Sequence, residues 1–360
     1  MPTGPDARVS ALQDLLDDAG LDAILVTKDA SIAYLSGFWG TQLERFFGVV
    51  VRRDGATLIA PSLDRESVNA APGTLERELY SAGESNGLPE LFARLEGATR
   101  VGVEEDHLVH YRGDALREAG FELVPAAGTM MHLREVKDAE EVDRVRAACA
   151  HIAVAYDELW ASLKVGDSEQ ETNARVDYLL KRRGAREVHA HILFGAHSAD
   201  SHGTPDARTL AAGDVVVADI AAQFDGYWGD ITRCATAGAP GDWAQAAWNV
   251  VHEAYVAAVA ASRPGVPARD VDAAQRSIVG AATDIGQVLH GAGHAIGNEI
   301  HEPPFLIPSS PATLRAGMIF TIEPGIYNSN VGGLRLEDDV LVGADGPVLL
   351  SHLPLELRVL

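Results

Sequence analysis

Short apolar runs alternate with helical patterns over the first 125 residues of the chain. Between residues 6 and 19, apolar side chains recur at the spacing of one helix face, and Gly20 ends the pattern. Two apolar runs flank Asp54-Gly55, a pair typical of a tight β-turn. Helices interleaved with strands in this way indicate a small α/β domain. The predicted elements are a helix at 6–19, a strand at 21–27, a hairpin at 46–61, a strand at 100–106, a helix at 112–120 and a strand at 121–126.

The pattern changes where a long helix is predicted to begin. Asp138 and Glu141 have the spacing of a capping box, and apolar residues continue on one helix face beyond them. We therefore place a domain boundary near residues 130–137. The predicted domains are residues 1–130 and 131–360. The further helices predicted in the second domain, separated by glycine-rich apolar strands, are 168–183, 242–261 and 268–284.

Composition and charge restrict the possible functions. The 360 residues include 47% hydrophobic and 22% charged side chains, which is ordinary for a folded soluble protein. The formal net charge of −23 disfavours nucleic acid as a partner, because such a chain repels phosphate groups and attracts cations. Two cysteines, Cys149 and Cys234, make no disulfide framework. The sequence contains no recognisable signal peptide or membrane-spanning run, so we expect a cytoplasmic protein without a membrane partner.

Two acidic residues lie within apolar strands, where a charge is expensive. Asp219 lies at the end of the run VVVADI, and Asp230 lies in the following strand GYWGDITR. An average aspartate near a strand end is a turn or capping residue. Burial of a carboxylate inside a strand, however, costs free energy unless the group is paired or binds a metal.

The same arrangement recurs toward the C-terminus. Glu323 in GMIFTIEPGIY and Glu337 in GGLRLEDDVLV each lie in a predicted apolar strand, although Glu323 alone could be a turn residue before Pro-Gly. Four carboxylates that converge on one point repel one another unless a cation is present. Together with one imidazole they suit Mn²⁺, Co²⁺ or Zn²⁺, and they are too many for one tetrahedral ion. The residues therefore predict two divalent ions, which activate water and polarise a carbonyl in amide hydrolysis.

Five ordered segments of the chain resemble the creatinase/aminopeptidase P/prolidase family of dinuclear "pita-bread" metallopeptidases. The segments are SADSHG (198–203), ADIAAQFDGYWGDITR (218–233), GAGHAIGNEIHEPP (291–304), TIEPGIY (321–327) and LRLEDDVLV (334–342). The resemblance covers the C-terminal two-thirds of the chain, and the N-terminal part is similar to the family's smaller domain with less specific sequence. It implies an α/β N-terminal domain followed by an α+β pita-bread catalytic domain.

The resemblance also implies a ligand set. Asp219 would bind one metal, His294 and Glu323 would bind the other, and Asp230 and Glu337 would bridge the two. The spacings that fit the family are 11 residues from Asp219 to Asp230, 7 from His294 to His301 and 14 from Glu323 to Glu337.

Further catalytic roles follow from the same resemblance. His202 and His301 match two substrate-side histidines that hydrogen-bond in the transition state, and Glu323 would also shuttle a proton. Arg335 lies on the same strand face as Glu337. It would orient that carboxylate or the substrate, or be purely structural.

The chain departs from the family pattern without losing a ligand. Phe305 takes a position where some prolidases have an arginine that reads the substrate carboxylate, so a dipeptidase would need another cation. Arg45 in FWGTQLERFFG is our candidate, and a surface charge is its alternative role. The other departures are small residues in place of the family's usual ones: Ser201, Ala221, Cys234 and Ala295.

Other interpretations of the histidines and glycines have less support. The glycines of GAGHAIG miss the spacing of a nucleotide-binding loop by one residue, and HEPP lacks the second histidine of a zincin. His189 and His191 alternate on a predicted strand, where packing or cleft lining is expected rather than metal binding. His290 has no expected partner and is interpreted as structural.

The sequence thus predicts an Xaa-Pro peptidase with two divalent ions, Mn²⁺ first and Co²⁺ or Zn²⁺ as alternatives. Its substrate would be a small peptide with proline at P1′, and the family analogy implies a homodimer. The short chain and compact N-terminal domain favour a dipeptidase (prolidase) over an aminopeptidase P. A non-catalytic binding module is a further alternative, against which the complete ligand set argues. Methionine aminopeptidases share the ligands but lack such an N-terminal domain, and creatinase lacks the full set.

Overall fold

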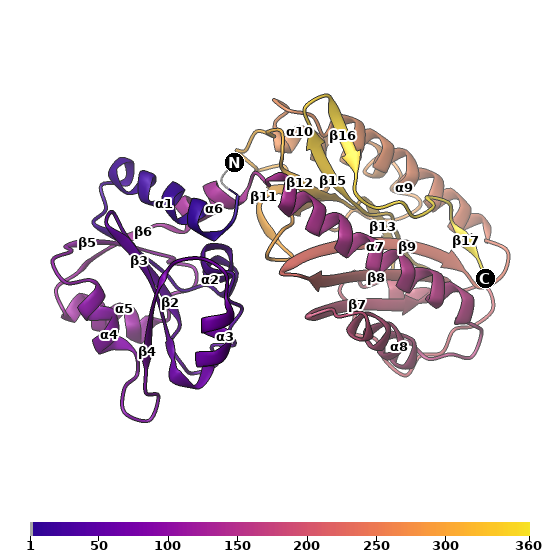
Figure 1. The fold of residues 1–360 in the computed structure, drawn as a ribbon. Coiled ribbons are helices and arrows are strands. Elements are labelled where there is room, and N and C mark those ends of the chain that lie inside the picture. Colours follow the sequence, from indigo (N-terminus) through magenta and orange to yellow (C-terminus); the bar gives the residue numbers. More distant parts are fainter. Residues whose placement is uncertain (1–2) are drawn as a thin grey trace. The chain divides into compact units, whose positions relative to one another are not determined.

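The structure is a computed structural model that describes residues 3–360 (Figure 1). The chain divides into two compact units, residues 1–134 and residues 135–360, here called the N-terminal unit and the C-terminal unit. The division falls shortly before helix α7 (Ala139–Ser162).

The N-terminal unit is an α/β domain built on one mixed six-stranded sheet. Its strands are β1 Ala23–Val26, β2 Gly48–Arg52, β3 Gly55–Pro61, β4 Glu76–Tyr80, β5 Arg100–Val103 and β6 Glu122–Pro125. Its helices are α1 Pro5–Ala19, α2 Asp29–Ser36, α3 Arg65–Ala70, α4 Leu88–Arg94, α5 His110–Glu118 and α6 Ala127–Arg134, with a 3₁₀ turn η1 at Ser62–Asp64. The strand order is β4-β3-β2-β1-β5-β6, with antiparallel pairs β1–β2 and β2–β3 and parallel pairs elsewhere.

Both faces of this sheet are buried, which accounts for its largely apolar strands. Along β2, Val49 and Val51 pack with Leu16 of α1, whereas Val50 between them packs with Leu91 of α4 on the opposite face. All the elements predicted for this part of the chain are observed, with ends displaced by a few residues. The structure adds α2, α3, α4, α6 and β4.

The C-terminal unit combines helices with three sheets. Its helices are α7, α8 Glu169–Arg182, α9 Asp242–Ala261 and α10 Ala268–Val279, with a 3₁₀ turn η2 at Gly195–Ala199. Its strands are β7 Glu187–Phe194, β8 Val215–Phe224, β9 Tyr227–Thr236, β10 Gly293–Ala295, β11 Glu302–Leu306, β12 Ile319–Ile322, β13 Gly325–Asn328, β14 Gly332–Arg335, β15 Asp338–Gly343, β16 Gly346–Leu349 and β17 Arg358–Val359. The sheet orders are β17-β9-β8-β7, β11-β10-β12-β15-β16 and β13-β14.

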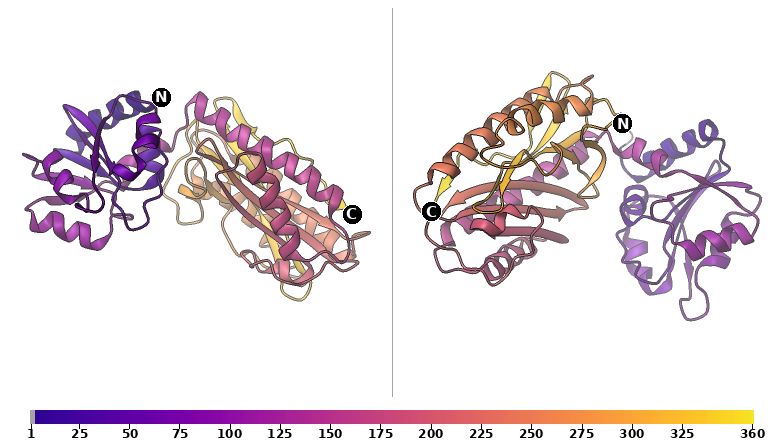
Figure 2. Two further views of the ribbon diagram at one scale, coloured as in Figure 1. Left: turned by 60° about the horizontal axis from the view of Figure 1, so that its bottom comes forward. Right: turned by 180° about the vertical axis from the view of Figure 1, so that it is seen from behind.

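Helices cover the outer faces of these sheets, so the inner faces meet each other. Helices α7 and α8 pack on the β7–β9 sheet, where Ile152 and Tyr156 contribute to one core. Helices α9 and α10 pack over the other sheets, where Val251 and Tyr255 contribute to a second core (Figure 2). The arrangement is an α+β domain, as expected.

The N-terminus of α7 and the C-terminus of α10 can be compared with the helix ends predicted from the sequence. The side chain of Asp138 accepts from the N–H of Glu141, and the side chain of Glu141 accepts from the N–H of Asp138, both at 2.9 Å, which confirms the capping box. Helix α10 ends at Val279 and is shorter than the predicted 268–284, with Gly280 as its C-cap residue in the right-handed conformation.

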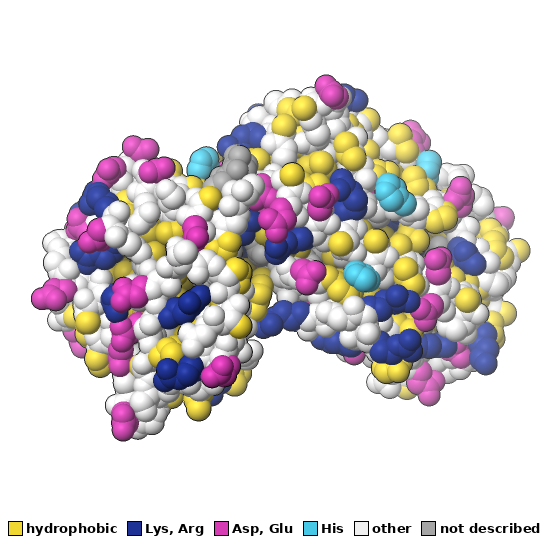
Figure 3. All heavy atoms as spheres, viewed as in Figure 1, with side chains coloured by type: hydrophobic (Ala, Val, Ile, Leu, Met, Phe, Trp, Pro, Cys, Tyr) yellow, Lys and Arg dark blue, Asp and Glu magenta, His cyan; other side chains and the backbone are white. Residues whose placement is uncertain are grey.

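The surface charge and the helix composition can be compared with what a nucleic-acid or membrane partner would require. Acidic and basic side chains are interspersed over the face that Figure 3 shows, so the negative charge is not gathered into one patch there. Within residues 3–360, no helix combines the length and the apolar character needed to cross a bilayer.

Candidate metal centre

Asp219 and Asp230 lie on one face of the β8–β9 hairpin. The register pairs Asp219 with Thr232 and Ala221 with Asp230, which places the two carboxylates diagonally across the ribbon. Strand alternation determines which face this is, because Val217, two residues before Asp219, packs into the core with α9 and the other sheets. Both aspartates therefore face the space between the sheets.

Glu323 and Glu337 lie at breaks between strands, which corrects the prediction of two continuous strands. The run 317–327 divides into β12 and β13 at Glu323-Pro324, where proline has no N–H for the ladder. The run 332–342 divides into β14 and β15 around Glu337. At both breaks the chain changes sheets, between the five-stranded sheet and the β13–β14 pair.

His294 on β10 completes the group. Its Nδ1–H donates to the carbonyl of Ala295 at 3.1 Å, so Nε2 is the nitrogen left to face the acids. Nε2 lies 3.6 Å from Oε1 of Glu323 and 4.0 Å from Oδ2 of Asp230. Gly293 before it allows a close backbone approach, because a Cβ there would lie 1.9 Å from the carbonyl oxygen of Thr321.

All five predicted ligands line one cavity of about 200 Å³. Asp230, His294 and Glu337 each offer a donor atom within 4.8 Å of the others. Threonine hydroxyls orient two of the five carboxylate and imidazole side chains. Thr232 Oγ1 donates to Glu337 at 2.6 Å, and Thr321 Oγ1 lies 3.4 Å from Glu323.

The carboxylates perturb one another. Burial, together with the nearby charges of Glu337 and Asp219, raises the pKa of Asp230 well above its usual range. Burial and the charges of Glu323 and Asp219 raise the pKa of Glu337 in the same way. Burial also acts to raise the pKa of Glu323, but its charge interactions with His290, His294 and Arg335 outweigh burial and hold that pKa below its usual value.

This donor set fits divalent cations. Within the described chain, Oδ1 of Asp230 is buried without a hydrogen-bond partner, so it is available to a ligand. Four carboxylates and one neutral imidazole nitrogen in a small cavity are donors that Mn²⁺, Co²⁺ or Zn²⁺ accept. A cation would also relieve the mutual repulsion that raises the pKa values of Asp230 and Glu337.

The two predicted substrate-side histidines also line the cavity. The ring of His301 lies 4.0 Å from that of His294, centroid to centroid. Burial, with a contribution from His294, lowers the pKa of His301, so its ring is neutral at neutral pH. His202 is exposed and carries no side-chain hydrogen bond among residues 3–360.

Arg335 contacts Asp219 more closely than Glu337. Its Nη2 hydrogen-bonds Oδ2 of Asp219, whereas its Nε lies 3.6 Å from Oε2 of Glu337 and donates to Thr232 Oγ1 at 3.1 Å. The guanidinium is buried, which fits a role in orienting the ligand side chains.

Tyr327 and His290 also belong to the site, although the sequence indicated no role in it for either residue. Tyr327 accepts from Nη1 of Arg335 at 3.1 Å, and its hydroxyl lies 2.8 Å from Nε2 of His290. Nδ1 of His290 donates to the carbonyl of Gly291, so Nε2 accepts the tyrosine proton. His290, for which the sequence indicated no partner, therefore has one in Tyr327, and its interpretation as a structural histidine stays a prediction. Its place four residues before His294 was the available signal.

The remaining expectations concern the cavity wall and the histidines beside it. Phe305 and Ile307 provide an apolar wall. Arg45 belongs to the N-terminal unit, and its part in substrate binding stays a prediction. His189 packs edge-to-face on Trp228, with ring centroids 5.1 Å apart.

Comparison with known families gives two matches. Residues 143–344 match the model of metallopeptidase family M24, and residues 8–136 match the creatinase/prolidase N-terminal domain. These matches confirm the expected architecture of an α/β domain and a pita-bread domain.

Individual proteins are similar over almost the whole chain. An uncharacterised peptidase of Staphylococcus aureus is 32% identical over an alignment of 359 residues, which covers 96% of this chain and 99% of the relative. The structure of an Xaa-Pro dipeptidase from Bacillus anthracis matches with a TM-score of 0.91 at 29% identity, covering 98% of this chain and 99% of that one. The structure of an X-Pro aminopeptidase from Thermotoga maritima matches with a TM-score of 0.88 at 25% identity, covering 98% and 99%.

Proposed function

The chain belongs to metallopeptidase family M24, and on that premise we propose that it is an Xaa-Pro peptidase, which hydrolyses the amide bond before proline. The proposal rests on one observation: five side chains that can bind a metal line one small cavity together with His202 and His301. Similar structures described as an Xaa-Pro dipeptidase and an X-Pro aminopeptidase support the bond that is cleaved.

Asp219, Asp230, His294, Glu323 and Glu337 would hold two divalent ions, with Mn²⁺ as the first candidate and Co²⁺ or Zn²⁺ as alternatives. When bound, such ions lower the pKa of water and polarise the scissile carbonyl. The unpartnered Oδ1 of Asp230 supports this ligand set.

The chain's own groups supply orientation and proton transfer. Glu323, whose lowered pKa keeps it ionised, accepts a proton on its carboxylate, while Thr321 steadies that side chain. His202 and His301 line the cavity and hydrogen-bond the oxyanion and the amide of the reacting peptide. Arg335 holds Asp219 in place.

Substrate length depends on a cation for the peptide's terminal carboxylate. Among the residues lining the cavity, the only arginine or lysine is Arg335, and Asp219 and Tyr327 already occupy it. A dipeptidase would therefore use a cation from outside this cavity, for which Arg45 is our candidate. The same observation favours the second candidate, an aminopeptidase P, whose longer substrates carry their carboxylate elsewhere.

The deciding experiment compares Ala-Pro with Ala-Pro-Ala under added Mn²⁺. We expect the enzyme to hydrolyse the Ala-Pro bond in both peptides. The peptide with the higher kcat/KM then shows whether a dipeptide or a longer substrate is preferred. D219N and E337Q should remain folded and lose hydrolysis. Wild-type turnover in either variant would contradict the ligand set, and purified protein with no bound or activating metal would contradict the enzyme itself.

Arg45 has its own test. In a dipeptidase, R45A should weaken hydrolysis of Ala-Pro far more than hydrolysis of Ala-Pro-Ala. An equal effect on both substrates would remove Arg45 as the group that reads the carboxylate.

A further inference from the structure

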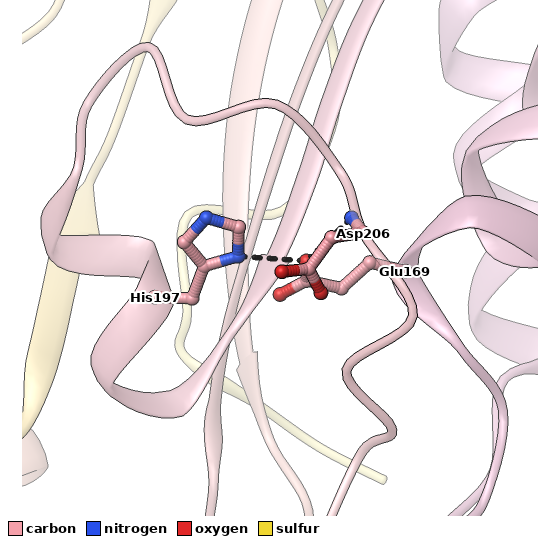
Figure 4. Close-up of side chains that lie close together, drawn as sticks. All are labelled: Glu169, His197 and Asp206. Carbon is pink, nitrogen blue, oxygen red and sulfur yellow. Dashed lines mark hydrogen bonds and ion pairs between the residues drawn. The ribbon is translucent and has the colours of Figure 1, made fainter.

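Glu169, outside the cavity, is a buried carboxylate that gathers hydrogen bonds. It is the first residue of α8 and is fully buried. Its Oε1 accepts from the N–H of Phe194 at 2.8 Å. Its Oε2 accepts from Nδ1 of His197 at 2.7 Å, the bond that Figure 4 shows as a dashed line. The same oxygen accepts from the N–H of Asp206 at 3.1 Å. These donors and the helix N-terminus offset the cost of burying the carboxylate.

The three donors come from the two ends of one segment, residues 194–206. Phe194 and His197 lie where this segment leaves β7, and Asp206 lies where it returns to α8. A backbone hydrogen bond also ties the Asp206 end of the segment to α8, because the N–H of Gln170 donates to the carbonyl of Asp206 at 3.0 Å. One buried side chain thus closes the loop at both ends. This loop carries His202.

Two carboxylates and an imidazole together are also the ligand types of a metal site, as the cluster of Glu169, His197 and Asp206 illustrates. The geometry argues against an ion. Two donors each about 2.1 Å from a tetrahedral zinc ion lie about 3.4 Å apart. The 2.7 Å between His197 and Glu169 is a direct hydrogen bond instead, and the carboxylate is already satisfied by N–H groups.

His202 needs such a support, because its exposed ring makes no side-chain hydrogen bond within the described residues. With no side-chain hydrogen bond among residues 3–360, its position is determined by its backbone. The ring of His197 lies close to Gly203, the residue after His202. A Cβ on Gly203 would be 3.2 Å from Nε2 of His197. Nδ1 of His191 also contacts this residue, at 3.2 Å from the carbonyl oxygen of Gly203. Contacts therefore run from Glu169 through His197 to the neighbour of His202.

We propose that Glu169, acting through His197, is a positioning residue that holds the loop of residues 194–206 so that His202 faces the substrate. The role of His202 in this statement rests on the proposed function. Neither Glu169 nor His197 lines the cavity, so both act on the reaction only through the loop.

A double-mutant comparison tests the kinetic part. E169Q keeps the shape of the side chain but replaces an acceptor oxygen by an N–H₂ group that faces N–H donors. We expect kcat to fall about 10- to 100-fold with little change in KM, since a displacement of about 1 Å has effects of this size. E169Q/H202A should be no slower than H202A alone. The matched control is E171Q, the same change on an exposed residue of the same helix turn, and it should keep wild-type rates.

His197 offers a second route that does not alter the buried acid. H197N retains an N–H donor near the position of Nδ1 and should keep most activity, whereas H197A should behave like E169Q. Losses in E169Q and H202A that multiply in the double mutant would overturn the proposal, and so would equal losses in H197N and H197A.

Two measurements are independent of activity. The imidazole NMR signal of His202, identified by its loss in H202A, should shift in E169Q and stay unchanged in E171Q. A chain that cleaves no Xaa-Pro bond but gives this shift would contradict the proposed function and leave the positioning intact. An unshifted signal would overturn the positioning. So would a Zn²⁺ titration in which H197A lost one bound equivalent, because the cluster would then be a metal site.

Discussion

At the scale of single residues, the site depends on groups that hold the expected ligands in orientation. Tyr327 is the clearest case, because its hydroxyl accepts from Arg335 and donates to His290. Burial raises the pKa of Tyr327 to about 12, so the proton that this donation requires stays on the hydroxyl at neutral pH. Arg335 in turn holds Asp219. The phenol therefore lies two contacts away from a predicted metal ligand.

We expect Y327F to lower kcat/KM about 10- to 100-fold, which is typical when a group that orients a metal ligand is removed. Steady-state kinetics on Ala-Pro or Ala-Pro-Ala would measure it. Y80F removes another buried hydroxyl, in the N-terminal unit, and serves as the control. Equal rates for Y327F and wild type would show that the hydroxyl does not support Arg335.

Gly293 gives a prediction about stability. G293A would press a methyl group against the carbonyl of Thr321, at a φ of 152° that side chains rarely adopt. We expect a loss of about 1–3 kcal/mol in the free energy of unfolding. G128A, in α6 with open space around the added methyl, should be neutral. Urea unfolding compares the two, and equal midpoints would contradict the close approach.

At the scale of elements, what could be predicted from the sequence is what local chemistry decides. The hairpin beside Asp54-Gly55 and the capping box at Asp138 need only neighbouring residues. Both are observed, but the two turn residues are Arg53 and Asp54, because Gly55 pairs with Arg52 as the first residue of β3. The strand breaks at Glu323 and Glu337 were missed, because the apolar runs before and after each acid were interpreted as one continuous strand, in spite of Pro324 after Glu323 and the two aspartates after Glu337. The partner of His290 was missed because it lies 37 residues further along the chain.

Lys137 and Glu302 form a buried pair that joins the segment before α7 to β11. The two charged groups lie 3.0 Å apart, with each side chain 1% exposed. We expect K137M to cost about 3–5 kcal/mol in unfolding free energy, because the acid is left buried without its counter-charge. K137M/E302Q should recover part of that loss.

R146M provides the surface control for this pair. Arg146 and Asp143 form an exposed pair on α7, so its removal should cost less than about 1 kcal/mol. Chemical denaturation would measure all three variants. If K137M and R146M cost the same, burial would not strengthen the Lys137–Glu302 pair.

At the scale of the whole molecule, metal content and stability should be linked through pH. Asp230 and Glu337 have pKa values raised above their usual 3.8 and 4.5 in the folded chain without metal. The unfolded chain gives up these protons at lower pH, so the metal-free fold loses stability as the pH rises above those values. Glu323, with its lowered pKa, stabilises the fold as the pH rises toward its usual 4.5 and adds no further change above that value.

We therefore expect the difference in Tm between Mn²⁺-loaded and EDTA-treated protein to widen from pH 5 to pH 8. Metal ions take the place of the protons and remove the penalty. Calorimetry at several pH values would measure it, and D230N/E337Q should flatten the dependence. A difference in Tm that stayed constant with pH would contradict the coupling. The homodimer and the cytoplasmic location stay predictions of the sequence.

The β8–β9 hairpin has a consequence for how the chain folds. Asp219 and Asp230 come together when a single tight turn closes, which is fast and costs little entropy. Glu337 meets the same ribbon only across a separation of 105 residues, at its contact with Thr232. The topology thus sets an order of assembly, in which two of the five predicted ligands come together early and the other three arrive last. We therefore expect divalent ions to bind at the end of folding, where they would stabilise a nearly complete fold rather than nucleate it.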